Sequence, residues 1–356
     1  MDPRQIHRRL EDALGDVVPG AELRLAAALA AEILELKRER GAVILAHNYM
    51  DPALCLTVAD HCGDSLELSR RAAEVDAERI VFCGVRFMAE TAKLLSPGRK
   101  VLLPSEIGGC SLAASVTAEQ VREMKRRHPG VPVVCYVNTY AEVKAECDVC
   151  CTSGNAAEVV ESLDAETVIF IPDEFLARNV AASTGRRILV LGGDEAIAPQ
   201  SPGLLGWPGR CEVHERFSVD DVQNARRQFP DVVILAHPEC RPEVVAAADF
   251  AGSTSAMIRY VERTPAPRYL LLTECAMGDN IAAANPEKQL LRMCSVRCPH
   301  MNEVTLEGVR DSLLLDRHEI FVPEEVAERA ARAIRRMLEI RPRHESGPAA
   351  AAPAGS

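Results

Sequence analysis

The chain has 356 residues, of which 47% are hydrophobic and 4% aromatic, so it can form two or three domains with cores of Val, Ile, Leu and Ala. A formal net charge of −11 argues against nucleic acid or an anionic membrane as a partner. The sequence has no secretory signal and no apolar run of about 18 residues. With thirteen cysteines, this indicates a reducing cytoplasm, where cysteines serve metal or redox chemistry rather than disulfides.

The predicted elements start with a helix at 21–40, rich in Ala, Leu and Glu. A block in which short apolar runs alternate with helical stretches then occurs three times, which predicts parallel sheets covered by helices. The predicted first strands are 43–46, 133–137 and 232–236. The predicted buried third strands are 79–83, 167–171 and 269–273. Residues 322–340 open with a proline and two acids and close with arginines, which predicts a final helix.

The repeat predicts an α/β fold of three homologous small domains, because its period is too long for a solenoid unit. In each block an Asp stands five residues before a hydroxyl, and the block ends at a cysteine. We expect an N-terminal helical segment at 1–40, repeats at 41–127, 128–227 and 228–321, a C-terminal helix at 322–340 and a disordered tail at 341–356.

Four hydroxyl residues each follow a short strand and precede a helical stretch: Ser65, Ser153, Ser253 and Thr254. An ordinary N-cap explains any one of them. Their recurrence at one place in every block also predicts three helix N-termini that share a pocket for carboxylates or phosphate. Both interpretations stay open at this point.

Polar side chains end the predicted first strands: His47, Asn138 and His237. The carboxyl ends of parallel strands form the usual ligand edge of an α/β sheet. Tyr49 and Glu239 follow two of these positions, so groups that carry protons gather there. His, Tyr and Glu are the residue types that tautomerisation and dehydration require.

The three block-ending cysteines are Cys110, Cys211 and Cys298. One thiolate from each domain on a shared metal cluster would leave one coordination position open for chemistry. The remaining cysteines include core fillers at Cys83, Cys135 and Cys275 and a weaker metal candidate at Cys147-x-x-Cys150. A zinc site built from Cys211-x-x-His214 and Cys294-x3-Cys298-x-His300 is a further alternative, but it ignores Cys110.

Nine stretches across residues 40–340 together resemble the quinolinate synthase (NadA) family. They are ILAHNY (44–49), GDSLEL (63–68), GVRFMAETAKLLSP (84–97), VCYVNT (134–139), CTSGN (151–155), GRCEVHERF (209–217), HPEC (237–240), GSTSAMI (252–258) and CPHM (298–301).

The resemblance implies three α/β/α domains, each a three-layer unit with a parallel sheet, in a pseudo-threefold arrangement around a central [4Fe–4S] cluster. Three cysteines would ligate the cluster: Cys110, Cys211 and Cys298. The implied reaction condenses iminoaspartate with dihydroxyacetone phosphate to quinolinate, with loss of phosphate and two waters, for NAD biosynthesis. The open iron would act as a Lewis acid without net redox change. L-aspartate oxidase or a dehydrogenase would supply iminoaspartate.

The resemblance also implies residue roles. Glu239 with His237 would be the acid/base pair for cyclisation and dehydration, and Tyr49 with His47 would serve isomerisation and phosphate loss. The implied substrate-binding set is His47, Ser65, Tyr136, Asn138, Ser153, His237, Glu239, Ser253 and Thr254. Asp64 is expected to orient this set.

The chain departs from the family pattern at three places. Residues 192–210 form a longer segment than expected, either a surface insertion or a lid, and Cys294 is a spare thiol or a redox partner. Glu174 replaces an expected Lys at a position predicted to be peripheral. Two rival functions remain: another [4Fe–4S] hydro-lyase for a small hydroxy acid, and a non-catalytic zinc or redox-sensing protein.

Overall fold

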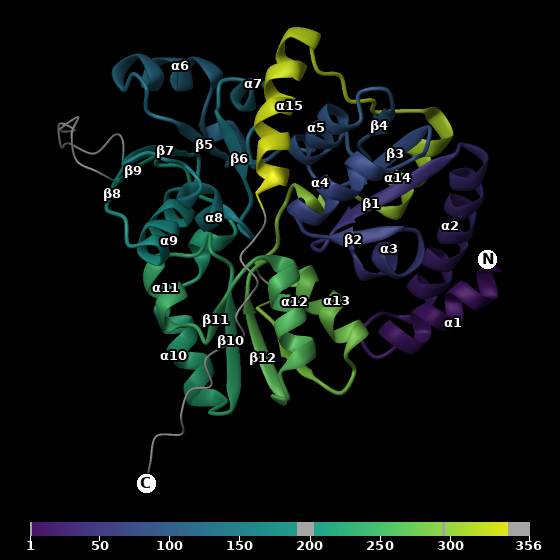
Figure 1. Cartoon of the computed structure of the whole chain (residues 1–356). Helices are drawn as coiled ribbons and strands as arrows, with labels where there is room; N and C mark the ends of the chain where they lie inside the picture. The colour runs from purple at the N-terminus through teal and green to yellow at the C-terminus, as the bar shows by residue number, and fades with distance from the viewer. Residues whose placement is uncertain (1, 191–202, 294–295, 341–356) are drawn as a thin grey trace.

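The computed structural model describes residues 2–190, 203–293 and 296–340. Three parallel sheets lie around a common centre (Figure 1). The first has the order β2 (His61–Gly63), β1 (Ala42–His47), β3 (Arg79–Cys83), β4 (Lys100–Leu102). The second has the order β6 (Val149–Cys151), β5 (Val133–Tyr136), β7 (Thr167–Ile171), β9 (Gly203–Gly206), β8 (Ile188–Val190). The third has the order β11 (Phe250–Ala251), β10 (Val232–Ala236), β12 (Arg268–Leu272), β13 (Gln289–Leu291).

Helices cover both faces of these sheets, which confirms the predicted three-layer α/β/α fold class. Two helices precede the first sheet: α1 (Pro3–Leu14) and α2 (Gly20–Glu39). The first repeat carries α3 (Pro52–Thr57), α4 (Ser65–Glu74), α5 (Arg86–Leu95) and α6 (Ala118–Arg127). The second carries α7 (Ala141–Lys144), α8 (Ala156–Glu161), α9 (Glu174–Thr184) and α10 (Val219–Gln228). The third carries α11 (Pro242–Ala247), α12 (Thr254–Arg263), α13 (Cys275–Ala284) and α14 (Leu306–Leu315).

The helices predicted at 21–40 and 322–340 are confirmed as α2 and α15, and the segment 1–40, which was expected to be helical, also contains α1. The final helix, α15 (Glu324–Glu339), packs against α5, α7 and β6, so it bridges the first two repeats (Figure 1). Its buried face consists of Ala330, Ala331, Ala333, Ile334 and Met337. The predicted disordered tail at 341–356 and Cys294 lie outside the described residues. Within the described ranges, no helix combines the length and the apolar character needed to span a membrane.

The structure explains the Asp that recurs in every block. Asp148 accepts the N–H of Val133 at 2.8 Å, and its own N–H donates back to the Val133 carbonyl. Asp60 and Asp249 make the same pair of bonds to Ile44 and Ile234, respectively. In each repeat a cation from the preceding helix also binds the carboxylate: Lys37, Lys125 and Arg226. The recurrent Asp is therefore a structural clamp on each first strand.

The second sheet differs from its neighbours because of residues 192–210. Its run at Ile188–Val190 forms the edge strand β8. Strand β9 lies beside β7 in the equivalent place. Gly203, at φ 152°, permits this insertion, because a Cβ there would lie 2.4 Å from the Arg187 carbonyl oxygen. The described part of this segment, residues 203–210, contributes a strand to the sheet. Residues 192–202 lie outside the described residues, so the surface insertion and the lid both stay predictions.

The clamp yields a stability prediction. Replacing Asp148 with Ala removes the acceptor of a strand N–H and the partner of Lys125, so the free energy of unfolding should fall by about 1–2 kcal/mol. Asp76→Ala is the control, since that carboxylate is 97% exposed and pairs with Arg99 at the surface. Urea unfolding measures both changes, and equal losses in the two variants would contradict the clamp.

Candidate active site and metal centre

The carboxyl ends of β1, β5 and β10 converge on a cavity of about 70 Å³. Twelve of the predicted site residues line it: His47, Tyr49, Ser65, Tyr136, Asn138, Ser153, His237, Glu239, Thr254, Cys110, Cys211 and Cys298. Ser253 does not line the cavity, but it donates a hydrogen bond to Asp64, which does, at 2.9 Å. The parallel topology therefore gathers residues from all three repeats in one place.

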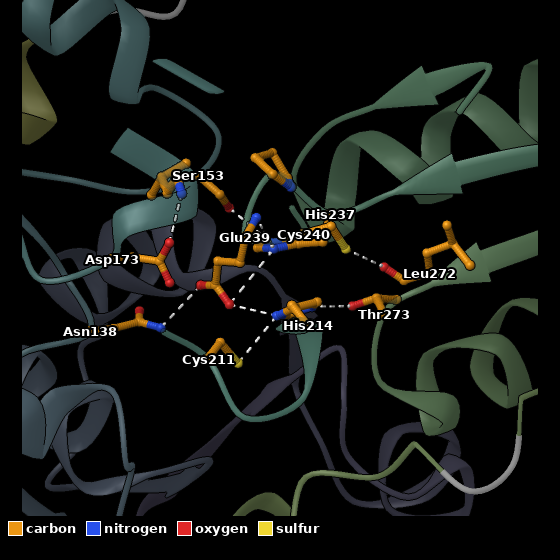
Figure 2. Close-up of polar contacts among 12 residues, drawn as sticks. Asn138, Ser153, Asp173, Cys211, His214, His237, Glu239, Cys240, Leu272 and Thr273 are labelled. Atoms are coloured by element: carbon orange, nitrogen blue, oxygen red, sulfur yellow. Dashed lines mark hydrogen bonds and ion pairs between the residues drawn. The ribbon is translucent and has the colours of Figure 1, made fainter. Parts of the chain in front are cut away.

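The carboxylate of Glu239 is buried in the cavity, with 3% of the residue exposed. Asn138 and His214 both approach it (Figure 2). Tyr136 donates its hydroxyl to Oε1 at 2.5 Å, and Asn138 Nδ2 approaches the same oxygen at 3.4 Å. His214 Nδ1 lies 2.6 Å from Oε2. Burial acts to raise the pKa of Glu239, but His214, His237 and these hydrogen bonds together hold it below its usual range. Glu239 is therefore an anion held by fixed donors.

His214, which contacts Glu239, and Thr273 form a hydrogen-bonded path from Glu239 to Tyr49. His214 Nε2 lies 2.9 Å from Thr273 Oγ1, and that hydroxyl lies 2.5 Å from the Tyr49 hydroxyl. Hydrogen bonds thus connect Tyr49 to Glu239 through two residues absent from the predicted site. His214 stands in the stretch GRCEVHERF (209–217) and in the Cys211-x-x-His214 spacing, but the sequence assigned it a role only in the alternative zinc site. No sequence motif indicated a role for Thr273.

His47 and His237 occupy equivalent places in the first and third repeats. In each, the backbone N–H two residues later donates to Nδ1, from Tyr49 at 3.2 Å and from Glu239 at 3.3 Å. The neutral rings therefore carry their proton on Nε2, which in His237 faces Ser153 Oγ at 3.2 Å. Burial lowers the pKa of His47 to about 4 and that of His237 to about 3. Both rings are neutral proton-handling groups at neutral pH.

The four predicted hydroxyls separate into two kinds. Ser253 is an N-cap, since it accepts the N–H of Ala256 at 3.3 Å. The cap interpretation is wrong for Ser65 and Ser153, because Asp64 and Asn155 occupy the cap positions of α4 and α8. Thr254, the first residue of α12, accepts a hydrogen bond from Asn48 at 2.9 Å. Ser65, Ser153 and Thr254 instead line the cavity.

The three cysteines share one local structure. A single turn of 3-10 helix begins three residues after each of them: Ala113–Ser115, His214–Arg216 and Met301–Glu303. Burial raises the pKa of all three thiols, to about 12 in Cys110 and about 11 in Cys298. Backbone N–H groups two and three residues after each cysteine bond the sulfur and oppose this rise. A metal that binds thiolates in this cavity would find N–H donors already directed at each sulfur.

A different metal site is also available within the cavity. Among the described residues, only Cys211, His214 and Glu239 bring three ligand atoms within 4.8 Å of one another. This group contains Cys211 and His214 of the alternative zinc site, but His300 is instead paired with Glu212 at 3.2 Å. The Cys147-x-x-Cys150 pair is not among the residues that line the cavity. The donor chemistry of the cavity, rich in thiols and imidazole, fits a metal cofactor.

The neutral histidines predict how stability depends on pH. The native pKa values of His47 and His237 both lie below the value of about 6.5 for an unfolded histidine. The contribution of the two neutral rings to the free energy of unfolding is therefore complete above pH 6.5. As the pH falls further, the unfolded chain takes up protons that the native rings exclude, and stability falls by up to about 1.4 kcal/mol per pH unit for each ring. His237→Gln should remove one ring's share of the slope measured by urea unfolding between pH 6.5 and 5. Identical slopes in the two proteins would contradict this.

The comparisons with known proteins agree on one family. The model of the NadA family, described as quinolinate synthetase A protein, matches residues 31–339. Quinolinate synthase 2 of Mesorhizobium japonicum is 50% identical over 331 residues, which cover 93% of this chain and 97% of that protein. Quinolinate synthase of Agrobacterium fabrum is 50% identical over 93% of this chain and 91% of its own length. Quinolinate synthase of Xylella fastidiosa is 52% identical over 86% of both chains. The chain therefore belongs to the quinolinate synthetase A (NadA) family of enzymes.

Proposed function

We propose that the chain condenses iminoaspartate with dihydroxyacetone phosphate to give quinolinate, phosphate and two waters, for NAD biosynthesis. Atoms and electrons balance in this reaction without an external oxidant. The observation that carries the proposal is the cavity itself, where three cysteines, two neutral histidines and an ionised glutamate come together from three repeats. The names of the relatives support the same product.

Cys110, Cys211 and Cys298 would hold a [4Fe–4S] cluster. Two observations support this: the three cysteines line one cavity, and each sulfur accepts hydrogen bonds from backbone N–H groups. Apolar side chains in the cavity wall, including Phe87 and Met301, would keep the dielectric low around the cluster. When bound, a cluster with three protein ligands supplies a Lewis-acidic iron that polarises an oxygen of the substrate and assists loss of water.

Glu239 and His237 would move protons during cyclisation and dehydration. Glu239 is an anion and therefore a base, and His237 presents a proton on Nε2 that it can donate. Tyr49 and His47 would serve isomerisation and the loss of phosphate. The hydrogen-bonded path from Tyr49 through Thr273 and His214 would let Tyr49 and Glu239 exchange protons between steps.

The remaining polar residues would bind the carboxylates and the phosphate. Ser65, Ser153 and Thr254 present hydroxyls to the cavity, and Asn138 and Tyr136 approach Glu239 from the second repeat. Ser253 would act through Asp64, whose carboxylate caps α4 and accepts the Ser253 hydroxyl. The domain limits given above and the supply of iminoaspartate by L-aspartate oxidase or a dehydrogenase remain predictions.

A product assay tests the proposed function. Anaerobically purified protein should convert iminoaspartate and dihydroxyacetone phosphate into quinolinate, detected by liquid chromatography and mass spectrometry. Changing Cys110, Cys211 or Cys298 to Ala should abolish quinolinate formation and reduce bound iron, while Cys147→Ala should retain both. Full turnover in any of the first three variants would contradict the cluster assignment. Turnover of a hydroxy acid without quinolinate formation would favour the rival hydro-lyase.

Glu239 provides a test of the proton-transfer steps. Glu239→Gln keeps the shape and the hydrogen bond from Tyr136 but removes the base, so kcat should fall by about 10²–10⁴-fold with iron content unchanged. Glu243→Gln is the matched control, because that carboxylate is exposed at the start of α11. Wild-type turnover in Glu239→Gln would remove Glu239 from the mechanism.

A further inference from the structure

In every repeat, one main-chain bond docks the segment before the cysteine onto a helix. The first residue of the helix after the third strand donates its N–H to the carbonyl two residues before the cysteine. These bonds join Arg86 to Gly108 at 2.7 Å, Glu174 to Gly209 at 2.7 Å, and Cys275 to Val296 at 3.1 Å. The three cysteines thus reach the cavity from the N-termini of α5, α9 and α13.

The second repeat reinforces this bond with closely packed backbone. A Cβ on Gly209 would lie 2.4 Å from the carbonyl oxygen of Pro172, so the segment approaches the start of α9 as closely as a glycine allows. Trp207, the only tryptophan, donates its backbone N–H to Phe170 and its indole N–H to the Ser115 carbonyl, each at 3.1 Å. The segment 207–211 is therefore attached both to its own sheet and to the first repeat.

Glu174 and Arg210 add a charged contact at this place. Arg210 binds one oxygen of Glu174 through Nε at 3.1 Å and Nη2 at 2.9 Å, and Arg178 binds the other oxygen at 2.8 Å. The Glu174 side chain is 7% exposed. Arg210 also stacks over the Phe175 ring at 5.0 Å, which limits its motion. Glu174 was expected to be peripheral, but it is a buried anion bonded to the residue next to Cys211.

Arg178 and Arg210 differ in which segment of the chain they connect to Glu174. Arg178 lies on α9, one turn after Glu174, so its bond stays within one helix. Arg210 lies on the cysteine segment, so its bond joins that segment to α9. The third repeat shows a looser version of the same contact, with Arg297, which precedes Cys298, lying 3.7 Å from Asp279 on α13. An arginine before the cysteine, paired with an acid on the docking helix, thus occurs twice.

We propose that Glu174 and Arg210 are positioning residues that fix Cys211 at the metal centre. The Glu174 carboxylate holds the Arg210 guanidinium, and Arg210 fixes the backbone that presents the Cys211 sulfur to the cavity. The identity of the bound group rests on the proposed function, but the ordering of the segment does not.

Segment-resolved hydrogen exchange of the full chain, with Glu174→Gln, Arg210→Gln and Arg178→Gln, tests this directly. Loss of a hydrogen-bonded charge pair between α9 and the segment should speed amide exchange in residues 207–213 about tenfold in the first two variants. Arg178→Gln removes a hydrogen bond to the other oxygen of the same carboxylate and should leave exchange there near the wild-type rate. Equal acceleration in Arg178→Gln and Arg210→Gln would overturn the proposal, as would a wild-type rate in Arg210→Gln.

Loss of the metal group provides a second readout. On anaerobic challenge with an iron chelator, the visible absorbance should decay about tenfold faster in Glu174→Gln and Arg210→Gln than in wild type or Arg178→Gln. If the wild-type protein binds no iron, the proposed function fails, whereas the exchange experiment still decides the role of the pair.

Discussion

A main-chain hydrogen bond that recurs in all three repeats fixes the position of the candidate active site. Each third strand ends at a helix whose first N–H binds the carbonyl two residues before a cysteine. Because this bond recurs in three repeats, each cysteine is delivered at the carboxyl end of a parallel sheet, next to the polar residue that follows the first strand. The repeated backbone geometry therefore creates the cavity. The side chains that differ between the repeats make the lining of the cavity chemically asymmetric.

Asymmetry begins with the residues after the first strands. The first and third repeats present histidines kept neutral by burial, while the second presents Asn138, which does not titrate. The third repeat supplies the carboxylate Glu239, and the second repeat supplies its partner His214. A buried carboxylate is costly without donors, so His214 and Tyr136 are as necessary to the site as Glu239 itself.

The sequence pattern predicted the fold class and brought together most of the candidate site, because strand runs and cysteines recur with the repeat. It missed β9, since GLLG has no β-branched residues and follows a segment that resembled a loop. It missed His214 and Thr273, because their importance comes from neighbours distant in the sequence. Glu174 was judged peripheral because its partner Arg210 lies 36 positions away and is brought close only by the sheet.

We propose that sulfur atoms from all three repeats bind one metal group. Diffraction at the iron absorption edge, from crystals grown without oxygen, tests it most directly. We expect a single compact iron feature in contact with the sulfur atoms of Cys110, Cys211 and Cys298, with no fourth protein sulfur. Metal density confined to Cys211, His214 and Glu239, with Cys110 and Cys298 unbound, would contradict it.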